Sequence, residues 1–327
     1  MRVAGIMAAV LLVGTVVAGC ASPETDSPSA SANSDAHPVT TTGALGSATI
    51  DERPERVVAL SWTDADILLS LGVTPVAIGK APNESGVQPW TAESLGDSHP
   101  AILQGVNTNV SVEEVAAQAP DLIVATKSFG LDNQYSQLSK LAPVVHYADT
   151  PSAETWQDAT QTIAAALGIS SQGDDVVAQT ESAIDDAAAA HPALDGKTYA
   201  FFVGPQPDST YVVNSTDDAG AKFLDQLGLT LTPFATAQPV SNIPGRAQIS
   251  NELLADTDAD LILATSSNGA LESVEQQPAF QSLGAVERGA YVPLAPTQAQ
   301  SIAFPSPPSL DWALDQVVPL LDSAVQR

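Results

Sequence analysis

Side chains that catalyse reactions or bind metal ions are few in this chain, and they do not form a recognisable set. The four histidines His37, His99, His146 and His191 are scattered, and no two have the spacing of a metal-ligand pair. His146 falls within a predicted strand, where a hydrogen-bonded core residue is the better interpretation. The sequence also lacks a dinucleotide-binding glycine motif, a phosphate loop and a nucleophile elbow. These absences argue against catalysis and against a metal centre.

The single cysteine, Cys20, offers a different chemistry. Met1-Arg2 is followed by an uncharged apolar run over residues 3–19, which is shorter than a membrane-spanning helix needs to be. The run ends in Val-Ala-Gly-Cys, which resembles a bacterial lipobox, where the cysteine sulfur receives a diacylglycerol and the chain is cut before it. An ordinary signal peptide with a chance cysteine is the alternative. We expect a signal peptide over 1–19 and a lipid anchor at Cys20, with the protein on the extracytoplasmic face of the cell membrane.

Composition narrows the partners and the number of domains. Residues 20–47 are rich in Ser, Ala, Thr, Pro and Asp, which predicts a disordered tether. Eleven Lys and Arg face 38 Asp and Glu, a formal net charge of −27, which disfavours a nucleic-acid partner. A chain of 327 residues is long enough for two core-bearing units.

Strand and helix patterns alternate along the rest of the chain. Predicted strands at 56–61, 75–80, 121–126, 144–148 and 197–204 alternate with predicted helices at 64–73, 110–120, 135–143 and 217–229. This order is typical of βαβ units with parallel sheets.

An internal repeat indicates how these units are grouped. Residues 110–128 match 249–267 when Asp121 is aligned with Asp260, which favours a duplication. We therefore expect an α/β fold with two lobes, over 48–170 and 192–327, with a ligand cleft between them. An Ala-, Asp- and Glu-rich helix over 171–191 would connect the lobes.

Several segments in order resemble one family of proteins, the substrate-binding proteins of ABC importers for iron–siderophore complexes. The segments are 54–61, 66–76, 111–114, 120–124, 141–145, 299–306 and 310–319. The resemblance implies two Rossmann-like lobes with parallel sheets, joined by one long α-helix that limits hinge motion. It also implies capture of a ferric siderophore and its delivery to an ABC permease. Iron would enter only as part of the ligand, with no cofactor and no metal ligands from the protein.

Ligands of such sheets bind beyond the carboxyl ends of the strands, so residues that follow strands are the candidates. A ferric siderophore needs cations for its chelating oxygens and aromatic faces for its organic body. The predicted ligand-binding residues are Trp62, Lys80, Trp90, Lys127, Tyr211, Arg246 and Phe304.

Each of these residues could instead be an ordinary surface cation or a core aromatic residue. Phe129 and Phe202 are weaker candidates, because phenylalanine at a strand end is usually core. The resemblance further implies permease docking through an acidic residue on each lobe, for which Glu93 and Asp225 are the candidates.

Three other functions stay open at the level of sequence. A haem or cobalamin receptor would use the same fold, and haem would call for a His or Tyr iron ligand. A membrane-tethered enzyme could use the same cleft. An adhesion or sensor lipoprotein could have lost transport.

Overall fold

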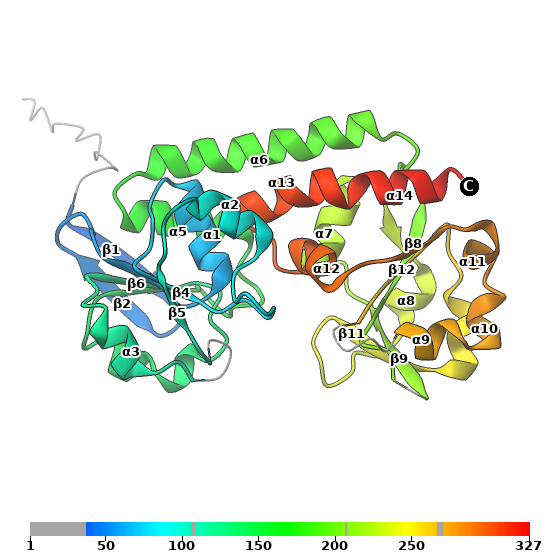
Figure 1. Cartoon of the computed structure of the whole chain (residues 1–327), viewed down its shortest axis with the longest axis horizontal. Coiled ribbons are helices and arrows are strands. Elements are labelled where there is room, and N and C mark those ends of the chain that lie inside the picture. The colour runs from blue at the N-terminus through cyan, green and yellow to red at the C-terminus, as the bar shows by residue number, and fades with distance from the viewer. Residues whose placement is uncertain (1–36, 106–108, 207, 267–270) are drawn as a thin grey trace, which may run out of the picture. The chain divides into compact units, whose positions relative to one another are not determined.

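The computed structural model describes residues 37–105, 109–206, 208–266 and 271–327, which belong to one compact unit. Figure 1 shows two α/β lobes, each built around its own sheet. The predicted signal peptide, the lipidation site Cys20 and residues 20–36 of the predicted tether lie outside the described residues.

The N-terminal lobe contains a five-stranded parallel sheet in the order β5-β4-β3-β6-β7. Its central strands are short apolar runs without exposed side chains, as expected for a parallel sheet with helices on both faces. The strands are β3 (Val57–Ala59), β4 (Ala77–Gly79), β5 (Ala101–Leu103), β6 (Leu122–Ala125) and β7 (Val144–His146). The helices are α1 (Trp62–Ser70), α2 (Pro89–Leu95), α3 (Val112–Ala117), η1 (Leu131–Asn133), α4 (Tyr135–Leu138) and α5 (Trp156–Ala166).

The C-terminal lobe has a mixed sheet in the order β11-β9-β8-β12-β13, with β10 beside β8. Strand β9 is antiparallel to β8 and β11, so the expectation of a wholly parallel sheet is wrong for this lobe. The strands are β8 (Thr198–Val203), β9 (Ser209–Val213), β10 (Thr230–Leu231), β11 (Arg246–Ser250), β12 (Leu261–Thr265) and β13 (Tyr291–Pro293). The helices are α7 (Ala219–Gln226), α8 (Pro233–Ala237), η2 (Asn251–Thr257), α9 (Leu271–Glu275), α10 (Pro278–Gln281), α11 (Gly284–Arg288), α12 (Pro296–Ala303), α13 (Pro307–Gln316) and α14 (Val318–Val325).

The two aspartates aligned in the sequence repeat have the same structural role. Asp121 precedes β6 and accepts hydrogen bonds from the backbone N–H groups of Glu55 and Arg56 at the start of β3, at 2.8 and 2.9 Å. Asp260 precedes β12 and accepts from the N–H of Thr198 at the start of β8, at 2.9 Å. Strands β6 and β12 also have equivalent places in their sheets. These matched hydrogen bonds support an internal duplication.

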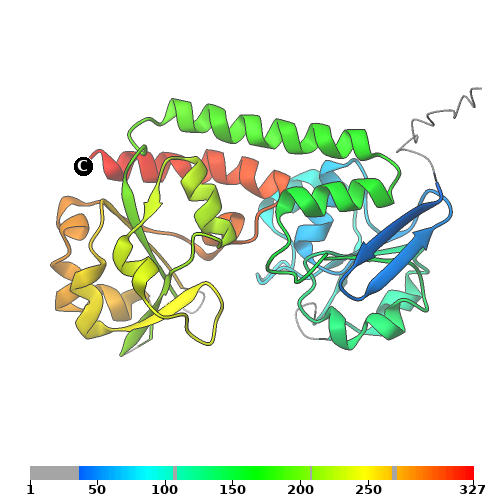
Figure 2. The same ribbon diagram turned by 180° about the vertical axis from the view of Figure 1, so that it is seen from behind.

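A β-hairpin corrects the predicted extent of the tether. Strands β1 (Val39–Gly43) and β2 (Gly46–Ile50) pair antiparallel, so the chain is ordered well before residue 47. The hairpin is fixed to the N-terminal lobe by hydrogen bonds from Ala44 N to Tyr147 O, at 3.0 Å, and from Leu45 N to His146 Nε2, at 2.9 Å. Figure 2 shows it beside α5. Threonines of high β propensity form these strands, although the polar composition of the region is typical of disorder.

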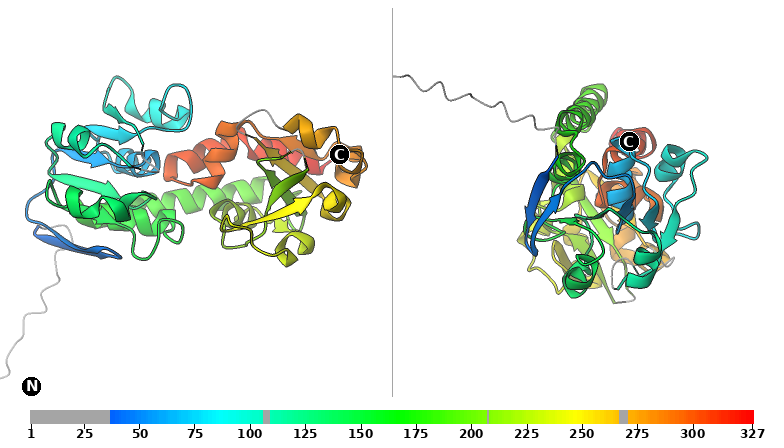
Figure 3. Two further views of the ribbon diagram at one scale, coloured as in Figure 1. Left: turned by 90° about the horizontal axis from the view of Figure 1, so that it is seen from below. Right: turned by 90° about the vertical axis from the view of Figure 1, so that its left-hand side faces the viewer.

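Helix α6 (Ser170–Ala190) lies where the connecting helix was predicted. It packs along α5 of the N-terminal lobe, while Val177 and Ile184 enter the core of the C-terminal lobe. Helix α13 lies beside α6 and also contacts α1 and α2, so two helices cross between the lobes (Figures 1 and 3). No helix among the described residues is long and apolar enough to span a membrane.

The contact between α5 and α6 depends on a glycine. A Cβ placed on the buried Gly173 would lie 2.4 Å from the Cβ of Ala164. Alanine is the better helix former by up to about 1 kcal/mol, but overpacking costs about 1–3 kcal/mol. We therefore expect Gly173→Ala to lower the free energy of unfolding by about 1–2 kcal/mol, measured by urea denaturation.

The matched control exchanges the two residues. In Ala164→Gly/Gly173→Ala the methyl group moves to the other helix, so the double variant should be more stable than the sum of the single changes predicts. If the changes in unfolding free energy of the two single variants simply added up in the double variant, the close approach of Gly173 to Ala164 would not limit packing at this interface.

Candidate ligand-binding site

Three of the predicted ligand-binding residues follow neighbouring parallel strands of the N-terminal sheet. Trp62 comes after β3, Lys80 after β4 and Lys127 after β6. The strand register places Ala59 of β3 beside Ile78 of β4 and Val124 of β6, so these strands end at nearly the same level. The three side chains therefore start from one edge of the sheet, as predicted for a site at the carboxyl ends of strands.

A buried carboxylate links two of these strand ends. Asp64, in the first turn of α1, accepts hydrogen bonds from the N–H of Thr126 at 3.1 Å and from the hydroxyls of Thr126 and Ser61. Ser61 also caps α1 by accepting from the N–H of Asp64. Burial raises the pKa of Asp64, and these donors oppose the rise. The network fixes the start of α1, and hence Trp62, against the end of β6.

An aromatic pair joins the two lobes at this edge. Trp62 begins α1, and Phe304 follows α12, and their ring centroids are 5.4 Å apart in an edge-to-face arrangement. Phe304 is 38% exposed. Trp62 is 5% exposed, and its indole Nε1 has no hydrogen-bond partner within the described ranges. A buried donor without a partner is costly, so this N–H would be stabilised by a ligand acceptor that reached it.

Trp90 lies elsewhere, in the interface between the lobes. Its indole N–H donates to Asp66 Oδ2 at 2.8 Å, and its ring lies 5.4 Å from that of Trp312 on α13. The side chain is only 3% exposed. Trp90 stays a predicted lining residue, but its polar atom and its ring face already have partners within the chain.

Asp66 accepts hydrogen bonds from both lobes and is fully buried. Besides Trp90, its donors are the hydroxyl of Thr91 on α2 and that of Ser306, which caps α13, the latter at 2.9 Å. Burial raises the pKa of Asp66 to about 7, the three donors oppose the rise, and nearby Asp64 adds to it. A second polar contact lies nearby, where Gln88 Nε2 donates to Gln300 Oε1 of α12 at 2.6 Å.

Sequence analysis missed this polar network. The available signal was two aspartates in the first turns of an otherwise apolar helix, at 64 and 66. Their burial and their partners arise from segments up to 240 positions away, which local patterns do not encode.

The two remaining N-terminal cations differ in their surroundings. Lys127 donates through Nζ to the carbonyl oxygens of Glu154 and Pro151, and burial lowers its pKa. Lys80 is half-exposed, and no ion pair involves it within the described ranges. Its aliphatic stem lies under Gly86, which has a φ of +75° and where a Cβ would be 3.2 Å from Lys80 Cγ. Lys80 is therefore the more accessible of the two for an anionic group.

The C-terminal lobe places its two candidates differently from the prediction. Tyr211 was expected to follow a strand, but it belongs to a strand itself, β9, where it is half-exposed opposite Val203, the last residue of β8. Arg246 is the first residue of β11, and its partner Val213 is two positions from Tyr211. Its guanidinium donates to Asp218 at 2.7 Å and to its neighbour's carbonyl at 2.8 Å. Tyr211 thus lies at the carboxyl edge of β8, whereas Arg246 lies further from that edge and is already paired.

The two phenylalanines that were weaker candidates differ in their exposure. Phe202 is fully buried, with its ring 5.9 Å from that of Phe280, as expected for core. Phe129, which follows β6, is 49% exposed at the same edge as Lys127 and joins the candidate site. Glu93 on α2 and Asp225 on α7, the predicted docking residues, are both exposed.

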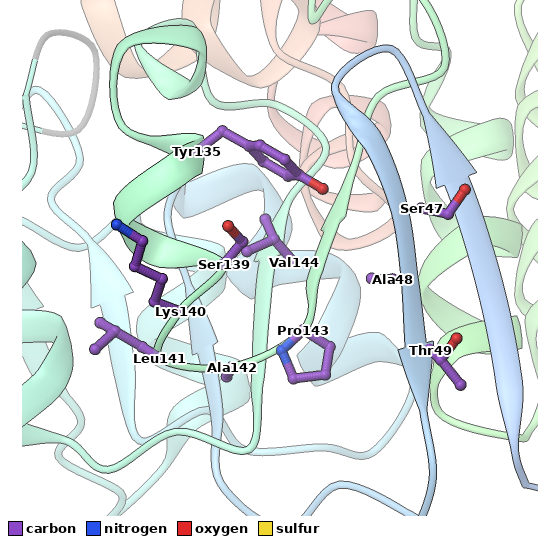
Figure 4. Close-up of a pocket in the computed structure, with 10 residues that line it drawn as sticks. All are labelled: Ser47, Ala48, Thr49, Tyr135, Ser139, Lys140, Leu141, Ala142, Pro143 and Val144. Carbon is purple, nitrogen blue, oxygen red and sulfur yellow. The ribbon is translucent and has the colours of Figure 1, made fainter.

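A separate cavity of about 370 Å³ lies where the β1–β2 hairpin meets α4 and β7 (Figure 4). Its lining includes Ser47, Thr49, Tyr135 and Lys140, together with Val144 at the start of β7. It therefore lies toward the amino ends of the strands and contains none of the predicted ligand-binding residues.

Comparison with known proteins identifies the scaffold. The family model described as "Periplasmic binding protein" matches residues 57–295. The chain belongs to this family. It is therefore a binding protein rather than an enzyme. A periplasmic solute binding protein from Mycobacterium smegmatis is 28% identical, with a TM-score of 0.76 over 88% of this chain and 98% of that one.

Two further members of the family have names that mention a ligand. The Fe(3+)-citrate-binding protein YfmC of Bacillus subtilis is 24% identical over 294 residues, which are 88% of each chain. PiaA of Streptococcus pneumoniae, solved in complex with ferrichrome, is 26% identical, with a TM-score of 0.74 over 88% of this chain and 99% of that one.

The raised pKa of Asp66 has a measurable effect on stability. Between about pH 4 and 7 the folded protein retains a proton on Asp66 that the unfolded chain has lost. The free energy of unfolding should therefore fall as pH rises through this window, by up to about 4 kcal/mol from this group. Asp66→Asn should flatten this pH dependence, because an amide does not titrate. The amide can still accept hydrogen bonds from Trp90 and Ser306 while donating to Thr91, so the local contacts should be retained.

Urea denaturation at several pH values measures the slope. Asp64, Glu154 and Asp311 also have raised pKa values, so part of the fall should persist in the variant. Asp186→Asn, an exposed change on α6, is the control and should leave the slope unaltered. An equal slope in Asp66→Asn and the wild type would contradict the assignment.

Proposed function

We propose that the protein is an extracytoplasmic receptor that binds a ferric siderophore at the carboxyl edges of its two sheets and delivers it to an ABC permease. The observation that carries the proposal is the aromatic pair of Trp62 and Phe304, one residue from each lobe, with an indole N–H that has no partner among the described residues. A ligand seated there would contact both lobes at once.

The chemistry of the edge suits this ligand. Iron in a siderophore is coordinated by the chelate's own oxygens, so the receptor needs aromatic faces and donors rather than metal ligands. Phe304 and Phe129 offer exposed rings, and Trp62 and Lys80 offer donors. In the described part of the chain, no three His, Cys, Asp or Glu side chains are placed to hold a metal ion.

Haem is less well supported as the ligand, because it requires an axial side chain. His146 ends β7, but it is buried and hydrogen-bonded to Leu45 N and Val144 O. His191 lies at the end of α6 beside Asp322, and His99 precedes β5. Tyr211 remains the one predicted site residue with a suitable oxygen.

Delivery to the permease requires the receptor to stay at the membrane. We propose that Cys20 carries the lipid after removal of residues 1–19, and that Glu93 and Asp225 contact basic residues of the permease. The exposure of both acids on different lobes supports this role.

Ligand binding should depend on the aromatic pair. We expect a ferric siderophore to quench tryptophan fluorescence saturably, and Phe304→Ala to weaken binding by about tenfold to a hundredfold through lost apolar contact. Trp62→Phe removes the N–H together with part of the aromatic surface and should cost at least about threefold to tenfold, measured by calorimetry.

Leu320→Ala is the matched control, since it removes another exposed apolar side chain, 41% exposed on α14. Its affinity should equal that of the wild type. If only haem or cobalamin saturates the protein, the proposed ligand is wrong. If Phe304→Ala binds with wild-type affinity, the binding site lies elsewhere.

Delivery is tested separately in cells. Cys20→Ser should move the protein from the membrane fraction to the soluble fraction. Glu93→Lys with Asp225→Lys should lower uptake of radioactive iron about tenfold or more, because two attractive contacts become repulsive, while ligand affinity stays unchanged. Normal uptake by the double variant would exclude these residues from docking.

A further inference from the structure

Most of the positive charges of this chain are placed away from the proposed site. Of the eleven Lys and Arg residues, five lie just before strands, at the amino edges of the sheets. They are Arg53, Arg56, Lys140, Lys197 and Arg288. Lys222, on α7, forms an ion pair with Asp217, which precedes that helix. Arg327 is the last residue of the sequence, and Arg2 belongs to the predicted signal peptide. Three cations therefore remain as candidates for contact with a ligand.

Two of these three are already compensated. Arg246 makes a 2.7 Å ion pair with Asp218, and both side chains are less than one-fifth exposed. Lys127 lies near the carboxylates of Asp64 and Glu154 and donates to two carbonyl oxygens. Lys80 is the remaining cation, and no ion pair involves it within the described ranges.

The stretches of sequence that follow β5 and β12 and lie outside the described residues contain no Lys or Arg. Residues 106–108, after β5, are Val-Asn-Thr, and residues 267–270, after β12, are Ser-Asn-Gly-Ala. Two exposed side chains at this edge are aromatic, Phe129 at 49% and Phe304 at 38%. The chain as a whole has a formal net charge of −27, which repels anions at long range.

We infer that the ligand is an electrically neutral ferric chelate, such as the trihydroxamate ferrichrome. A polyanionic catecholate or citrate complex fits the site less well. The inference rests on the proposed function. A triply negative complex would have to exchange its hydration for a site with one uncompensated cation, and unpaired buried charge is strongly unfavourable. A neutral chelate loses little hydration and gains contact with the aromatic rings.

The test is calorimetric titration of the purified full chain with ferrichrome, ferric enterobactin and ferric citrate, at low and high salt. We expect ferrichrome to bind about tenfold or more tightly than either anionic complex, with an affinity that salt does not change. Lys80→Gln should weaken ferrichrome binding about threefold to tenfold, as for one lost hydrogen bond, and equally at both salt concentrations.

A second variant tests the charge argument by gain of binding. Phe129→Lys places a cation at an exposed position on the same edge, so it should strengthen ferric enterobactin binding and weaken ferrichrome binding. Tighter binding of enterobactin or citrate by the wild type, with an affinity that falls with salt, would overturn the inference and leave the receptor function intact. Binding of no ferric chelate would overturn both.

Discussion

The arrangement of the two lobes depends on one buried carboxylate. Asp66 lies on α1 of the N-terminal lobe and accepts hydrogen bonds from α2 and from Ser306 at the start of α13. Because the group is fully buried, each donor offsets part of the cost of removing a charge from water. Losing any of them would leave a poorly solvated acid, so α1, α2 and α13 are constrained to stay together.

This constraint also positions the residues proposed to face the ligand. Ser306 follows Phe304 by two positions, so the hydrogen bond to Asp66 places the Phe304 ring against Trp62. The contacts between Trp90 and Trp312 and between Gln88 and Gln300 reinforce the same interface. With α6 and α13 both crossing between the lobes, closure on a ligand is expected to be small. Affinity must then come from complementarity that exists before the ligand arrives.

Much of the architecture was predictable because its signals are local. Short apolar runs gave the parallel strands of the N-terminal sheet, and the aspartate preceding β6 and β12 revealed the duplication. Strand ends placed Trp62, Lys80 and Lys127 at one edge, since the carboxyl ends of parallel strands necessarily share an edge. The antiparallel β9 escaped prediction, because strand direction depends on the partner and not on composition.

Whether the candidate side chains already have partners depends on residues that are distant in sequence. Trp90 has the residue type of a lining aromatic, but Asp66 and Trp312 enclose it. Arg246 has the residue type of an anion-binding cation, but Asp218, 28 positions earlier, neutralises it. Phe129 was ranked below both, and yet it is the exposed one. Residue type indicates what a side chain can do, whereas its neighbours determine whether it is free to do so.

The return of α13 to the N-terminal lobe has a consequence for the order in which the chain folds during synthesis. The chain emerges from the ribosome N-terminus first, so the strands of the first sheet can assemble early from local contacts. The hydrogen bond between Asp66 and Ser306 joins residues 240 positions apart, and it cannot form until nearly the whole chain has emerged. Until then, the surface of α1 and α2 that α13 will cover remains open to chaperones and proteases. The last step of maturation is therefore also the step that completes the proposed binding edge.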